Sequence, residues 1–105
     1  MGQQSRAAAQ RWAPVKVGKV VSTVSDDIVS LDVELVGDIH PEWERAFARM
    51  CAGRNSDLRL HAADEPPRIT LTTHRDHREA AEPAVLYAVE EVNLYIRLAL
   101  ELVGQ

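Results

Sequence analysis

The chain has 105 residues, of which 46% are hydrophobic and 27% are charged. This length suits one domain with its own core, and the composition is that of a folded globule, not of a disordered chain. A formal net charge of −4 argues against a large nucleic-acid footprint, and a single cysteine excludes an internal disulfide. With no signal-peptide pattern and no long uncharged apolar window, we expect a cytoplasmic protein that does not enter a membrane. Arg is far more frequent than Lys and Ala is abundant, a bias that favours a high-GC bacterium or one of its phages.

Residues 1–13 predict a flexible amino-terminal tail, because they show no apolar periodicity. Trp12 is the exception in this tail, since an indole has a large apolar body that gains from packing. We expect Trp12 to lie against its own domain or against a second subunit. Residues 14–105 are expected to form a single α+β domain.

Two strands are predicted directly after the tail. Residues 15–24 are rich in β-branched side chains, and Gly18 within them indicates a bulge or a close backbone approach. Residues 28–36 alternate apolar and polar side chains, which is typical of a strand with one buried face. The short polar residues 25–27 have turn chemistry, so the two strands should form a hairpin.

A first helix is predicted over residues 41–52. Pro41 suits its first turn, His40 is placed to cap or shield its start, and Gly53 is placed to end it. Apolar side chains recur along it at helical spacing: Trp43, Ala46, Phe47, Met50 and Cys51. Cys51 at the carboxyl end is expected to be a small inert core side chain, because a catalytic thiolate favours a helix amino terminus or a basic neighbour.

A second pair of strands is predicted at 58–62 and 68–73, joined by a segment with two consecutive prolines. Residues 75–82 then read as a polar lead-in to a second helix that starts at Pro83 and ends at Val103. A short helical turn over 76–81, kinked at Pro83, is the alternative to a clean start.

The order ββαββα predicts an α+β fold, a four-stranded antiparallel sheet with two helices on one face. It equals a ferredoxin-like βαββαβ order with the last strand moved to the front, an architectural analogy that carries no functional weight. The expected common core comprises Leu31, Val33, Phe47, Ile69, Leu71, Val85, Val89 and Val92. The polar face of the sheet is expected to carry Ser22, Ser30, Asp32, Glu34, Arg59, His61, Thr70 and Thr72.

Only one segment of the sequence resembles a metal-binding motif, and the resemblance is weak. His74 and His77 could reach one ion from a helical turn, with Glu79 as a further ligand. Arg75 and Arg78 flank them and oppose a cation, so we expect a solvated connection without a metal. The sequence contains neither a nucleophile with an activating neighbour nor a Gly-rich phosphate loop, and no catalytic residue or cofactor is predicted.

The second helix carries more apolar side chains than one buried stripe requires. Val85, Val89, Val92 and Ile96 belong to the stripe expected to cover the sheet, and Asn93 is assigned to the polar face. Outside that stripe, three further side chains fall within about 40° of one another on the helical wheel: Tyr87, Leu94 and Leu98. A second apolar strip on a helix usually marks a partner surface.

The leading hypothesis is therefore a non-enzymatic interaction module, accessory or regulatory, that acts as a homo-oligomer. A homodimer is the simplest form, with Tyr87, Leu94, Leu98 and Trp12 near the contact. Another protein could also be bound. The alternative within one subunit is that the first helix or the tail covers the strip.

Two other function classes stay open on the sequence alone. One is a small enzyme or ligand-binding protein with a site between subunits or at residues 74–79, with Tyr95, His74, His77 and Glu79 as candidates. The other is a nucleic-acid binder that uses the Arg-bearing tail and the first helix through Arg45, Arg49 and Arg54, although neighbouring acidic residues dilute that patch.

Overall fold

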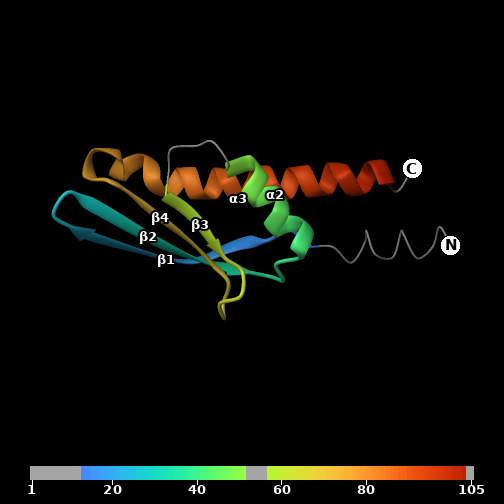
Figure 1. Cartoon of the computed structure of the whole chain (residues 1–105), viewed down its shortest axis with the longest axis horizontal. Coiled ribbons are helices and arrows are strands. Elements are labelled where there is room, and N and C mark those ends of the chain that lie inside the picture. Colours follow the sequence, from blue (N-terminus) through green and yellow to red (C-terminus); the bar gives the residue numbers. More distant parts are fainter. Residues whose placement is uncertain (1–12, 52–56, 104–105) are drawn as a thin grey trace.

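A computed structural model describes residues 13–51 and 57–103. In chain order the elements are β1 (Lys16–Ser25), β2 (Ile28–Val36), α2 (Pro41–Cys51), β3 (Asp57–His61), β4 (Arg68–His74), the 3-10 turn η1 (Arg75–His77) and α3 (Arg78–Val103). Both helices lie on the same face of the four-stranded sheet (Figure 1). The predicted α+β class and ββαββα order are confirmed.

The strands follow the order β1-β2-β4-β3, and each neighbouring pair is antiparallel. β4 therefore lies between β2 and β3, which run parallel to each other and are joined through α2. The central pair is in continuous register from Ile28 opposite His74 to Glu34 opposite Arg68. This register places the side chains that alternate along β2 and β4 on two faces, one apolar and one polar.

The expected irregularity at Gly18 is confirmed. The register between β1 and β2 shifts between Val17 and Val20, so β1 contains one extra residue there. A Cβ at Gly18 would lie 3.2 Å from Cγ2 of Val36, which is a tight approach. Glycine thus allows the two strands to stay close at the bulge.

The bulge also explains one wrong expectation about β1. Ser22 was assigned to the polar face of the sheet, but its register partner is the buried Leu31. Ser22 therefore belongs to the helix side, where it stays exposed at the edge of the sheet. The extra residue at the bulge changes which side chains of β1 face outward, because side chains alternate with a period of two.

The core lies between the helices and the two central strands. Every residue expected in it is buried, and the cluster also takes in Val15, Leu35, Trp43, Ala46, Ala81, Ala88 and Ile96. The rings of Trp43 and Phe47 stack on each other, with centroids 5.7 Å apart. Cys51 packs against this cluster as a half-buried side chain.

The second helix starts earlier than expected. α3 begins at Arg78 and continues through Pro83, instead of starting there. Ala81 is 4% exposed within the core cluster, so packing anchors the turn that precedes the proline. The carboxyl-terminal end of α3 reaches beyond the end of the sheet (Figure 1). Among the described residues, neither helix combines the length and hydrophobicity that a membrane span requires.

Candidate functional site

Six large apolar side chains of α3 are exposed among the residues that the structure describes, and Leu86 stands apart from the other five. These five are Tyr87, Leu94, Tyr95, Leu98 and Leu102, here called the α3 strip. Leu94 is 54% exposed, Leu98 49% and Leu102 73%. At about 100° per residue these side chains fall within roughly 100° of one another on the helical wheel. The buried Val85 and Val92 lie on the opposite side of the helix, so the strip points away from the sheet.

The helical spacing in the sequence predicts Tyr87, Leu94 and Leu98 on this surface, and in the structure all three are exposed on one side of α3. Tyr95 and Leu102 were not predicted to belong to this surface, although the same helical wheel places them close to Leu98. Each lies within about 60° of Leu98. Trp12 was expected near the same contact, and it lies outside the described residues.

Charged side chains border one side of the α3 strip. Nε of Arg97 donates to Oε1 of Glu101 over 3.3 Å, and both side chains are exposed. Glu90 is exposed on the same border, one residue before the half-buried Glu91. A largely apolar surface with charged side chains at its border is the usual anatomy of a protein–protein contact. The half-buried Glu91 falls among the strip residues on the helical wheel, so the strip also contains one carboxylate.

Asn93 has a structural role that the sequence analysis missed. Its Oδ1 accepts hydrogen bonds from Nε1 of Trp43 at 2.9 Å and from the backbone N–H of Val15 at 3.0 Å. Its Nδ2 donates to the backbone oxygen of Val15 at 2.8 Å. Asn93 therefore joins α3 to α2 and to the segment before β1, and it does not belong to the solvated polar face assigned to it.

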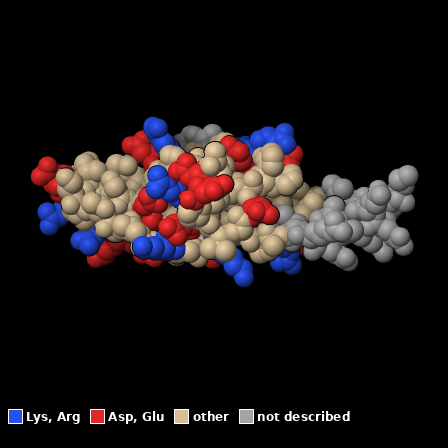
Figure 2. All heavy atoms as spheres, turned by 90° about the horizontal axis from the view of Figure 1, so that it is seen from below, with Lys and Arg blue, Asp and Glu red and all other residues tan. Residues whose placement is uncertain are grey.

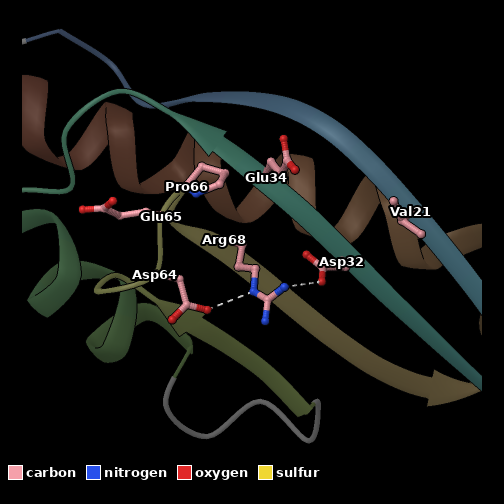
Figure 3. Close-up of a pocket in the computed structure, with 7 residues that line it drawn as sticks. All are labelled: Val21, Asp32, Glu34, Asp64, Glu65, Pro66 and Arg68. Carbon is pink, nitrogen blue, oxygen red and sulfur yellow. Dashed lines mark hydrogen bonds and ion pairs between the residues drawn. The ribbon is translucent and has the colours of Figure 1, made fainter.

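A groove of about 360 Å³ lies on the sheet face opposite the helices. It is lined by Val21, Asp32, Glu34, Asp64, Glu65, Pro66 and Arg68 (Figure 3). Nη1 of Arg68 contacts Oδ2 of Asp32 at 2.9 Å, and its Nε contacts Oδ2 of Asp64 at 3.0 Å. The carboxylates of Glu34 and Glu65 point away from the guanidinium (Figure 3).

The groove is acidic, with four carboxylates around one guanidinium. Two of the carboxylates are engaged by Arg68, and both they and Arg68 are more than a third exposed. Through these two ion pairs, Arg68 of β4 connects Asp64 in the β3–β4 loop to Asp32 of β2. Exposed ion pairs of this kind contribute little to the free energy of folding. The lining side chains do not form an acid–base pair around an enclosed substrate site.

The histidines of the 74–77 segment do not converge on a metal-binding geometry. Nδ1 of His74 accepts a hydrogen bond from the backbone N–H of Asp76 at 3.2 Å, so His74 caps η1. His77 and Glu79 are exposed. Within residues 13–51 and 57–103, no group of three His, Cys, Asp or Glu side chains is placed to hold a metal ion.

The other two histidines also have local partners. Nδ1 of His40 accepts from the backbone N–H of Glu42 at 3.3 Å, and the His40 carbonyl accepts from Glu44 at 3.0 Å. His40 thus caps α2, as expected. Nε2 of His61 lies 2.9 Å from Oγ1 of Thr70 on the neighbouring strand.

The basic residues of α2 do not gather into a continuous patch. Arg45 pairs with Glu42 on the same helix, and Arg49 lies one turn further on. Arg54 and the tail arginines lie outside the described residues. On the face drawn in Figure 2, basic side chains are scattered among acidic ones. That face of the described residues therefore offers no extended basic surface to a phosphate backbone.

Comparisons with protein-family models, with curated proteins and with solved structures gave no match for this chain.

Proposed function

We propose that this protein is a non-enzymatic interaction module that works as a homodimer, with the α3 strip as the contact between subunits. The observation that carries the proposal is the exposure of Tyr87, Leu94, Tyr95, Leu98 and Leu102 along one side of a helix whose opposite side is buried. A single exposed leucine on a protein surface is ordinary, whereas five large apolar side chains in one strip mark an interaction site.

The energetics favour covering this strip. Full burial of a leucine side chain stabilises by about 1.5–3 kcal/mol relative to exposure. A two-fold contact would bury Leu94 and Leu98 of both subunits, so the same surface contributes twice. The charged border formed by Arg97 and Glu101 then stays at the rim, where contact with water is retained.

A dimer of this kind suits an accessory or regulatory role in the cytoplasm. The described residues bring together no catalytic constellation, and the sheet face opposite the helices stays available for a further protein. A lone cysteine that packs against the core fits a reducing compartment.

The proposal is tested by measuring the mass of the full chain in solution by size-exclusion chromatography with light scattering. We expect a dimer for the wild type and a monomer for Leu94→Glu, because a carboxylate cannot be buried at the contact without a partner. The matched control is Leu86→Glu, a leucine of the same helix that is 36% exposed on a different side.

Retained dimerisation in Leu86→Glu, together with loss in Leu94→Glu, supports the α3 strip as the contact. A dimer that survives Leu94→Glu would place the interface elsewhere, at the polar sheet face or at the tail that carries Trp12. Circular dichroism of both variants is the control that checks whether either substitution unfolds the chain.

A further inference from the structure

Resting on the proposed function, we infer how the two α3 helices meet: they run antiparallel through their carboxyl-terminal ends, with the two-fold axis beside Leu98. Leu98 then faces Leu98 of the partner subunit, and Leu94 lies level with Leu102 of the partner subunit. Tyr95 completes the apolar contact, which uses the four exposed strip residues from Leu94 onward. The fifth strip residue, Tyr87, lies outside the overlap of the two helices.

The position of Glu91 limits the part of the strip that can form the contact. On the helical wheel this half-buried carboxylate falls among the strip residues, so an overlap that includes it sets it in the seam between the helices. Across the seam lies the strip of the partner subunit, which offers apolar side chains and a second copy of Glu91 but no cation. Enclosing a carboxylate without a cation is costly. An overlap that begins after Glu91 avoids this cost.

The shape of the molecule favours the same end of the helix. The carboxyl-terminal end of α3 reaches beyond the end of the sheet (Figure 1). With the axis beside Leu98, Asn93 lies level with Val103 of the partner subunit, and the helices overlap over about 15 Å. The two sheets then lie toward opposite ends of this overlap. In a parallel pair both sheets lie at the same end, and the continuing helices bring the two copies of Glu91 together.

The charged border of the strip favours the antiparallel direction, in which borders of the same kind face each other. Nε of Arg97 donates to Oε1 of Glu101 of its own helix at 3.3 Å. With the axis beside Leu98, Arg97 also lies two positions, or about 3 Å along the axis, from Glu101 of the partner subunit. In a parallel pair this border instead faces the border with Tyr95 and Ala99, where Arg97 meets no carboxylate.

The two arginines do not oppose this arrangement. On the helical wheel Glu101 lies between Arg97 and the seam. Each Arg97 is therefore closer to Glu101 of the partner subunit than to Arg97 of the partner subunit, and opposite charges dominate at the border.

The first test is disulfide trapping of the full chain in a Cys51→Ser background. Leu98→Cys alone should form the covalent dimer, because its two copies meet at the axis, where Cβ atoms about 4 Å apart suit a disulfide. Leu94→Cys alone is the matched control and should not cross-link, since its copies lie about 12 Å apart along the helix. An equal mixture of Leu94→Cys and Leu102→Cys should form the covalent heterodimer. A parallel pair predicts instead that Leu94→Cys cross-links with itself.

The second test examines the charged border by mixing. Arg97→Glu alone and Glu101→Arg alone should each weaken the dimer by about tenfold, because like charges then fill both facing borders. An equal mixture should favour the heterodimer in native mass spectrometry, since an acidic border then faces a basic one. Only a contact between subunits produces this preference, because each variant keeps its repulsion within its own helix. Glu82→Arg, an exposed position outside the strip, should leave the dissociation constant unchanged.

The third test asks whether Glu91 lies in the seam. Glu91→Gln should leave the dissociation constant of the dimer within about threefold of the wild type, because residue 91 lies outside the overlap. A dimer that becomes tighter by about tenfold or more would place this carboxylate in the seam and overturn the pairing, since removal of an enclosed charge removes its desolvation cost.

The outcomes separate this inference from the proposed function. A wild-type monomer overturns both. A dimer that Leu94→Glu splits, but in which Leu94→Cys cross-links with itself, overturns the antiparallel pairing while the α3 strip remains the contact. A dimer that Leu94→Glu does not split and Leu98→Cys does not trap has its contact outside the strip, and it overturns both.

Discussion

Nε1 of Trp43 donates a hydrogen bond to Oδ1 of Asn93 over 2.9 Å, between residues that are 50 positions apart in the sequence. The indole is 1% exposed, so this bond satisfies a donor that water cannot reach. Because Asn93 also binds both backbone groups of Val15, one amide joins three parts of the domain. The α3 strip projects from the other side of the same helix, and the amide therefore helps to fix how that strip is presented.

Asn93→Ala is expected to lower the free energy of unfolding by about 2–4 kcal/mol, because three hydrogen bonds are lost and the Trp43 indole is left unsatisfied. Urea denaturation at a fixed protein concentration measures the change, since dimerisation couples stability to concentration. Glu82→Ala, an exposed position of the same helix, should change stability by no more than about 0.5 kcal/mol. Equal stabilities for the two variants would show that the amide has no structural role.

Leu31→Ala is expected to destabilise the domain by about 2–5 kcal/mol, the usual range for a buried leucine. Leu31 is 4% exposed in the core, whereas Ile28 of the same strand is 45% exposed on the other face. Ile28→Ala is therefore the matched control and should lose less than about 1 kcal/mol. A loss below about 1 kcal/mol for Leu31→Ala in chemical denaturation would mean that the helix side of β2 has been misassigned.

Arg68→Met tests the acidic groove. Removal of the guanidinium leaves Asp32 and Asp64 without their ion-pair partner, in a groove that Glu34 and Glu65 also line. We expect a loss of about 1 kcal/mol at low ionic strength, most of it recovered in 0.5–1 M NaCl, because about 1 M salt screens exposed charges beyond roughly 3 Å. A loss that salt does not change would indicate that the aliphatic stem of Arg68 matters more than its charge.

Zinc, nickel and manganese are expected not to bind tightly to the 74–79 segment. Nδ1 of His74 is occupied by the Asp76 backbone N–H at 3.2 Å, and Arg75 and Arg78 place positive charge beside both histidines. Elemental analysis after dialysis checks this expectation. Stoichiometric metal in the wild type that is absent from His74→Ala would contradict it.

The sequence predicted the parts of the fold that depend on local periodicity. The alternation along β2 identified the buried Leu31 and Val33, and the helical spacing after Pro41 identified Trp43 and Phe47. These patterns repeat within a few residues, so they can be recognised without knowledge of the tertiary structure.

The remaining features depend on contacts between distant segments. The role of Asn93 could not be predicted because its partners Trp43 and Val15 are 50 and 78 residues away. The groove depends on the register that places Glu34 opposite Arg68, and alternation alone does not fix a register. The start of α3 depends on the packing of Ala81, which local propensity at Pro83 does not reveal.

The most direct test of the central claim is sedimentation equilibrium of the full wild-type chain from low to high micromolar concentration. We predict a weight-average mass that rises to twice that of the 105-residue chain and stays there, as a closed two-fold contact requires. A mass that remains that of a single chain at several hundred micromolar would contradict dimerisation through the α3 strip.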